Sequence, residues 1–311
     1  ISSLTLYGNL DIQSNATWRC GSLALNALGA VSIAAGGGLS ADGASTSSLG
    51  PGFTGSGGSG GGGHGGYGGR GVGTTVGGNV YDLATSPVQP GSPGGEYSTA
   101  GGYGGGRLRM TVSGPLTLEG TISANGGNAS TNISLNSKGG GGSGGGILLT
   151  LNQVSGTGRI LADGGNGWLN LGGGGGGGRI AVFWNSNSFT GKISAKGGAG
   201  FQGGGAGTIY LARRSGQILP SLIEDNGGLS GTNTLLSSRA TGSGLSLTIS
   251  GGAILRPESS TTMTMASLTV ATNSTFLSPG GGALNLILTG FAMVEAGGNI
   301  SADGQGYAGG S

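Results

Sequence analysis

Residues 172–184 read GGGGGGGRIAVFW, a glycine run that passes directly into an apolar segment. The same order recurs along the chain, and the segments that leave such runs are residues 107–112, 147–151, 179–184 and 208–211. In the first of these segments, Leu108, Met110 and Val112 alternate with polar residues. Successive side chains of a strand point to opposite faces, so this period of two predicts a β-strand with one buried face.

A short phrase recurs five times and reads as a strand that ends in a turn. Each copy begins with leucine or isoleucine, has alanine at its third position and ends in glycine; the copies are residues 39–43, 122–126, 160–164, 193–197 and 300–304. The first and third residues of a copy face the same side of a strand, and the final glycine can adopt positive φ. Repetition on this scale is typical of repeat architectures.

The composition favours an ordered fibrous protein. Glycine makes up 81 of 311 residues and proline only 8, which excludes collagen with its abundant proline and glycine at every third position. Charged residues make up 8%, and the net charge of +2 offers little to hold a nucleic acid or an anionic membrane. We therefore predict an all-β protein, with parallel β-solenoid (β-helix) coils beside stacked glycine-rich segments.

Two interpretations of the glycine runs remain open at this point. The runs are either unstructured insertions or extended threefold helices of the polyglycine II kind, which pack closely because they lack side chains. The second interpretation puts His64, Tyr67 and Arg70 on one exposed edge, because they are spaced three residues apart. We favour the ordered interpretation, since the runs recur at equivalent places before strands.

A larger repetition overlies the short phrase. Residues 25–43 match residues 286–304 at a constant offset, and residues 3–6 reappear as residues 246–249. We expect one super-repeat over residues 1–245, comprising solenoid coils (1–54), glycine-rich strand repeats (55–215) and connecting coils (216–245). Residues 246–311 then begin the next super-repeat, as expected of a piece of a long array or of a subunit whose two ends resemble each other.

Residues that could carry chemistry are few, and we predict no catalytic, cofactor-binding or metal-binding residues. His64 is the single histidine and is interpreted as a spacer, and Cys20 as a small buried residue. Asp42, Asp163 and Asp303 share one repeat position, but Asn125 and Lys196 occupy it elsewhere, which favours turn chemistry over a calcium ladder; no P-loop occurs. Glu224 and Asp225 are adjacent, so in a strand their side chains point apart and make a poor glycosidase pair.

The repeated phrase, its glycine run and the exit residues 179–182 resemble glycine-rich repeats of very large bacterial cell-surface and secreted proteins. Those are β-helical adhesin-like and fibre proteins. The resemblance covers mainly residues 100–215 and the copies at 29–43 and 290–304. It implies a surface or extracellular location and a fibrous role, and it carries no catalytic residues to transfer.

We therefore expect a non-enzymatic building block of an extracellular filament, sheath or cell-surface fibre that associates with itself head to tail and laterally. The alternative is an adhesin or passenger stalk that binds surface glycans or other cells. The tyrosines that lie beside glycines support this alternative; they are Tyr67, Tyr97, Tyr103 and Tyr307. We expect no cofactor and no nucleic-acid partner. We also expect no membrane span, because no apolar run approaches ~18–20 residues.

Overall fold

The computed structural model describes residues 2–45, 50–55, 58–73, 75–96, 100–130, 138–169, 171–215, 219–237, 242–258 and 262–306. These residues contain strands and no helix, so no helix among them is long and apolar enough to cross a membrane. The all-β part of the prediction is thereby confirmed. The strands are β1 (Ser2–Leu6), β2 (Leu10–Ile12), β3 (Thr17–Arg19), β4 (Ser22–Ala27), β5 (Val31–Ile33), β6 (Gly38–Ser40), β7 (Arg107–Leu118), β8 (Thr121–Ser123), β9 (Gly146–Gly156), β10 (Arg159–Leu161), β11 (Arg179–Phe189), β12 (Lys192–Ser194), β13 (Thr208–Arg213), β14 (Ser221–Asp225), β15 (Asn233–Leu236), β16 (Ser246–Ser250), β17 (Ile254–Pro257), β18 (Thr262–Met265), β19 (Ser267–Val270), β20 (Thr275–Leu277), β21 (Asn285–Leu288), β22 (Ala292–Val294) and β23 (Asn299–Ser301).

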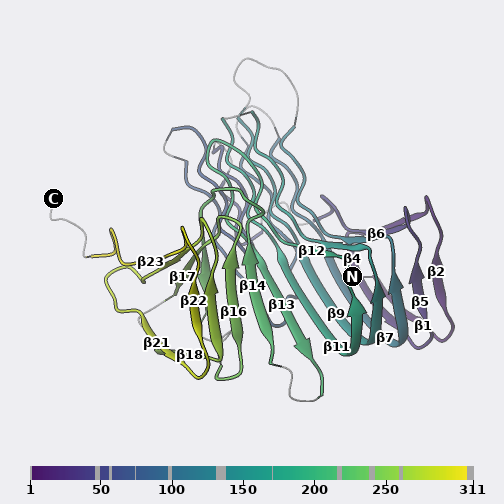
Figure 1. Ribbon diagram of the computed structural model, residues 1–311. Coiled ribbons are helices and arrows are strands. Elements are labelled where there is room, and N and C mark those ends of the chain that lie inside the picture. Colours follow the sequence, from purple (N-terminus) through teal and green to yellow (C-terminus); the bar gives the residue numbers. More distant parts are fainter. Residues whose placement is uncertain are drawn as a thin grey trace.

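A twelve-stranded sheet runs the length of the molecule in the order β1-β4-β7-β9-β11-β13-β14-β16-β19-β22, with β2 and β5 beside this path (Figure 1). Its strands pair in register: Met110 of β7 lies beside Leu149 of β9, which lies beside Val182 of β11. Each of the four segments that leave a glycine run forms a strand of this sheet. The sequence predicted these strands correctly, and in residues 107–112 the signal was the alternation that a strand with one buried face must show.

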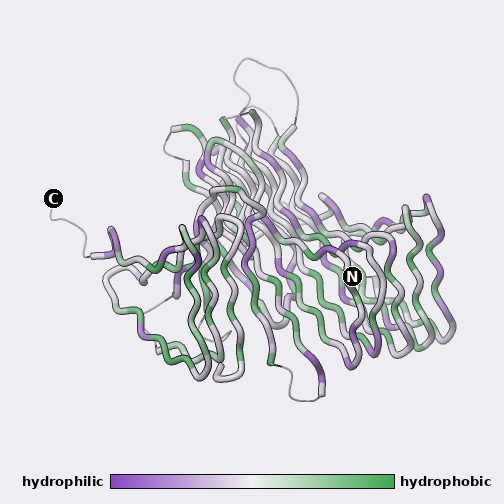
Figure 2. The backbone as a smooth tube through the Cα atoms, in the orientation of Figure 1, coloured by the Kyte–Doolittle hydropathy of each residue, from purple (hydrophilic) through white to green (hydrophobic). Residues whose placement is uncertain are grey.

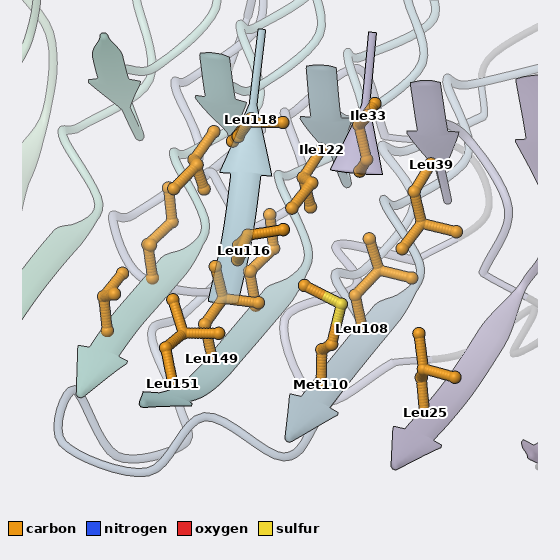
Figure 3. Close-up of a cluster of buried hydrophobic side chains, with 14 of the residues drawn as sticks. Leu25, Ile33, Leu39, Leu108, Met110, Leu116, Leu118, Ile122, Leu149 and Leu151 are labelled. Atoms are coloured by element: carbon orange, nitrogen blue, oxygen red, sulfur yellow. The ribbon is translucent and has the colours of Figure 1, made fainter. Parts of the chain in front are cut away.

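A five-stranded parallel sheet, in the order β12-β10-β8-β6-β3, carries four copies of the short phrase. The first residues of these copies stack directly on one another as Leu39, Ile122, Ile160 and Ile193. These side chains meet those of the large sheet in a continuous core, which Figure 3 shows around Met110. Ile122 is fully buried, and burying a side chain of this size stabilises the fold by about 1.5–3 kcal/mol.

The predicted parallel β-solenoid is wrong as a description of the whole chain. The strands divide among four sheets, and in the largest sheet β13 and β14 run antiparallel, with Tyr210 opposite Leu222. Every strand pair after β14 is parallel again, but these strands run opposite to those before it. The large sheet is therefore mixed.

The core also changes faces at this antiparallel pair. Ile209 and Ile223 belong to the first apolar core, whereas their neighbours Tyr210 and Leu222 belong to the second. Neighbouring residues of a strand point to opposite faces, so the two cores lie on opposite sides of one sheet. The antiparallel pairing itself follows from the short connection between Arg213 and Ser221, which can join antiparallel neighbours but is too short for a parallel crossover.

Candidate functional site

The glycine-rich segments form a block that rises beside the sheets; it is pale in the hydropathy view because glycine is neither strongly polar nor apolar (Figures 1 and 2). Runs far apart in sequence exchange backbone hydrogen bonds. The Gly62 N–H donates to Gly141 O, the Gly141 N–H to Gly173 O and the Gly176 N–H to Gly62 O, each at 2.9 Å. The three runs thus bond to one another pairwise. Their polar backbone is satisfied in several directions, unlike that of a flat sheet.

This packing depends on the absence of side chains. A Cβ on Gly61 would fall on Gly174 O, and a Cβ on Gly144 would fall on Ala162 O, both far inside van der Waals contact. Backbone oxygens cannot swing away as the end of a flexible side chain can. The glycine runs are consequently required by the close approach of neighbouring chains.

His64 lies inside the block, so its prediction as a spacer on an exposed edge is wrong. It is fully buried, with Nδ1 2.9 Å from Gly144 O and Nε2 3.4 Å from Asp82 Oδ2, and its ring lies 4.6 Å from that of Tyr81. Burial lowers the His64 pKa despite the nearby Asp82 carboxylate. Sequence spacing alone could not reveal this, because the burial comes from Gly144 and Tyr81, which are distant in the chain.

A second buried group comprises Arg179 and Glu224. Arg179 of β11 is 4% exposed and donates through Nε to Tyr81 O (2.8 Å) and through a terminal nitrogen to Thr208 Oγ1 (3.0 Å). Glu224 of β14 is fully buried, and neither of its carboxylate oxygens has a hydrogen-bond partner among the described residues. Burial raises the Glu224 pKa to about 8, although the Arg179 charge opposes this shift. Asp225 is exposed, which confirms that these adjacent carboxylates point apart.

A cavity of about 80 Å³ adjoins Arg179 and is also lined by Tyr81, Asp82, Thr208 and Glu258. This volume suits a few water molecules better than an organic substrate. Across the described residues, no three His, Cys, Asp or Glu side chains are close enough together to hold a metal ion.

The repeat position of Asp42, Asn125 and Asp163 forms a ladder between layers. The Asn125 N–H donates to Asp42 Oδ1 (2.6 Å), the Asp163 N–H to Asn125 Oδ1 (2.8 Å) and the Lys196 N–H to Asp163 Oδ1 (3.0 Å). Each side chain accepts from the backbone one layer further along. The prediction of a local turn role left out these hydrogen bonds between layers, because a local sequence pattern does not show which layer supplies the N–H donor.

A second ladder of the same kind was not predicted from the sequence. The Asn166 N–H donates to Asn128 Oδ1 (2.8 Å), and the Ala199 N–H donates to Asn166 Oδ1 (2.9 Å). The signal was available, because Asn128 and Asn166 follow their copies of the short phrase at the same distance.

The two ends of the molecule repeat one structural unit of two strand layers. The layers β1–β3 and β4–β6 correspond to β18–β20 and β21–β23. At one corner the Asn15 N–H donates to Gly36 O (3.2 Å), and at the other the Asn273 N–H donates to Gly297 O (3.0 Å). The phrase copy at residues 300–304 therefore plays the part of the copy at 39–43. The pairing aligns β1 with β18, while residues 246–249 lie one layer earlier, in β16.

The outer layers of both units have side chains that no neighbour covers. In β21–β23, Val294 is 47% and Ile300 43% exposed, whereas their counterparts Ile33 and Leu39 are 1% and 2% exposed. At the other end, Trp18 of β3 is half-buried. The difference arises because β7 and β8 cover β4–β6, and no described strand covers β21–β23.

The remaining residues singled out in the sequence have varied surroundings. Cys20 is half-buried against the first core, not fully buried as predicted, and burial raises its pKa. Tyr103 is 62% exposed and Tyr67 is half-buried. Tyr97 and Tyr307 lie outside the described residues.

Comparison of the chain with protein-family models, curated proteins and solved structures finds no match in any of the three. The resemblance to glycine-rich surface repeats stays a prediction.

Proposed function

We propose that this chain is a structural building block of an extracellular filament, sheath or cell-surface fibre, and that it has no catalytic role. The observation that carries the proposal is the repetition of one two-layer unit at both ends. The unit that buries Ile33 and Leu39 at one end leaves their counterparts Val294 and Ile300 half-exposed at the other. Unpaired sheet ends with apolar side chains favour association with further strands.

The glycine block and the ladders supply the mechanical part of the proposal. Backbone hydrogen bonds link neighbouring layers and neighbouring glycine runs, so an applied load is shared by many bonds in parallel. With charged residues at only 8% of the chain, little electrostatic repulsion opposes lateral contact between copies. Few side chains project from the glycine runs, which also allows blocks of adjacent copies to approach closely.

Self-association of the purified chain tests this function. We expect negative-stain electron microscopy to show filaments or sheets whose amount rises with protein concentration, and sedimentation velocity to show growing species. Labelled antibody against the chain should decorate fibres on intact producing cells. Monomers that persist over the whole concentration range, or label confined to permeabilised cells, would contradict the proposal.

The alternative proposal, an adhesin or stalk that binds glycans, is favoured by exposed aromatic side chains. Tyr103 is 62% exposed, and Phe201 is 44% exposed with the Arg70 guanidinium 5.5 Å from its ring centre. Exposed aromatic rings are suited to stack on sugars. A glycan array compared with the Phe201→Ala variant tests this directly: binding that the variant loses supports it, and an array without binding rejects it.

A further inference from the structure

We propose that the layer β1–β3 of one copy of this chain docks on the layer β21–β23 of another copy, in register. This inference rests on the proposed function and names its partner and contact. The layer β21–β23 corresponds to β4–β6, and β4–β6 is covered on its far side by the parallel strands β7 and β8. A second copy supplies such strands.

The two surfaces match in shape. The corner between the first and second strands has three residues in all the layers concerned: 7–9 in β1–β3, 28–30 in β4–β6 and 289–291 in β21–β23. The next corner has four residues in each: 13–16, 34–37 and 295–298. Strands of one layer therefore superimpose on those of the other, and no corner has to stretch or bulge.

The register follows from the pairing inside the chain. Ile300 is the counterpart of Leu39, which has Trp18 on one side and Ile122 on the other. A docked Trp18 that lies beside Ile300 therefore takes the place that Ile122 has beside Leu39. Applied to the core-facing positions of the other strands, the same rule gives apolar partners. The pairs, with the β21–β23 residue first, are Leu286 with Leu4, Leu288 with Leu6, Ala292 with Leu10, Val294 with Ile12 and Ile300 with Trp18.

Asp303 extends the ladder across this contact. Like Asp42, whose N–H donates to Ser40 Oγ at 3.3 Å, Asp303 donates its N–H to Ser301 Oγ at 3.0 Å. The Asp42 carboxylate accepts from Asn125 in the next layer, while the Asp303 carboxylate accepts from no described residue. In the docked arrangement, the donor in the place of Asn125 is the backbone N–H of Gly21 in the second copy.

Docking also requires one copy to be turned relative to the other. Leu10 of β2 and Leu268 of β19 occupy equivalent positions, and each faces an apolar core. Each also donates its N–H to the next layer, Leu10 to Ala30 O and Leu268 to Phe291 O. The two units therefore have the same handedness. The strands reverse at β13 and β14, however, and the core changes faces there. A second copy therefore matches strand direction and core only after about half a turn around the stacking axis, added to the ordinary twist of the sheet.

The test uses Cys20, the single cysteine of the chain. The register places it beside Ala302 of the other copy, at the in-register spacing of about 4.8 Å that lies within the Cα separation of a disulfide. Oxidation of the Ala302→Cys variant at high concentration should give a ladder of reducible oligomers, in which mass spectrometry finds peptides that join positions 20 and 302. An Ala41→Cys variant is the positive control, because the same register inside one chain should yield an intramolecular disulfide.

Two further variants make the result specific. Ser301→Cys places the thiol on the opposite face of the strand and should give at least fivefold less of the linkage to Cys20. Ala302→Cys combined with Cys20→Ser should give no product larger than a dimer. Filaments that form without a linkage between positions 20 and 302, while the Ala41→Cys control oxidises, would overturn this register and leave the proposed function standing. Absence of both filaments and linkage would overturn the two together.

Discussion

Asn15 and Asn273 occupy the same corner in two copies of one structural unit at opposite ends of the molecule. Their φ angles are 63° and 59°, both left-handed, and each donates its N–H to a glycine in the next layer. Those glycines, Gly36 and Gly297, have φ of 78° and 80°. Asparagine tolerates this region better than most residues, which explains its use at both corners. The chain thus builds the same two-layer unit twice. Described strands cover the layer β4–β6 of the first copy, and none covers the equivalent layer β21–β23 of the second.

The first prediction concerns this open layer. Ile300→Asp should reduce self-association at least tenfold without lowering the stability of the monomer, because Ile300 is already 43% exposed and a charge there disfavours only the docked state. Sedimentation equilibrium and urea unfolding measure the two effects. Ile287→Asp is the matched control, since Ile287 is 52% exposed and lies on the other face of β21. Equal association of Ile300→Asp and wild type would contradict the docking surface.

The second prediction concerns Glu224. Its pKa is raised from 4.5 to about 8, so between these values the unfolded chain releases a proton that the folded chain keeps. The contribution of Glu224 to stability is therefore retained below about pH 4.5 and falls as the pH rises towards 8, by up to about 1.4 kcal/mol per pH unit.

Glu224→Met should remove this slope and raise the free energy of unfolding at pH 8 by roughly 1–4 kcal/mol, because an apolar side chain replaces an unpaired buried acid. Urea unfolding between pH 5 and 9 measures it. Asp225→Asn changes the exposed neighbour and should leave the slope intact. A slope that survives in Glu224→Met would assign the pH dependence to another group.

The third prediction concerns the glycine block. Gly61→Ala should lower the free energy of unfolding by about 3 kcal/mol, because the new Cβ would collide with Gly174 O and neither backbone can move alone. Gly8→Ala is the control, since nothing lies within 4 Å of a Cβ at that position. Similar stability of the two variants would show that the runs are not closely packed.

The fourth prediction concerns the ladder. Asp163→Ala removes the acceptor for Ser194 Oγ (2.6 Å) and the Lys196 N–H (3.0 Å), and should cost about 1–3 kcal/mol. Asp163→Asn keeps an acceptor and should recover most of this loss. Asp303→Ala, at the equivalent position of the open layer, should leave monomer unfolding unchanged and weaken association only. Loss of monomer stability in Asp303→Ala would contradict this division.

Strand positions could be predicted from the sequence because alternation is a local property. Residues 107–112 lie within β7 as predicted, since Leu108, Met110 and Val112 are buried on the same face of the strand. The change of faces at β13 could not be read in this way. Ile209, Tyr210 and Leu211 are apolar on both faces, so their pattern fits a core on either side.

The packing inside the glycine block could not be predicted from the sequence either. Glycine carries no side chain whose pattern could distinguish a packed run from an exposed one, and the neighbours that bury His64 come from segments 80 residues away, such as Gly144. Proline offered a partial signal: Pro220 just before β14 marks the place where the chain reverses. Combined with the apolar run of β13, it would have indicated a break in the array.

Fibre diffraction from aligned filaments of the wild-type chain tests the central claim most directly. If copies stack end to end through β1–β3 and β21–β23, the strands lie across the fibre axis and their spacing repeats along it. We then expect a strong meridional reflection at about 4.8 Å. Filaments with this reflection on the equator, or a chain that remains monomeric at every concentration, would contradict it.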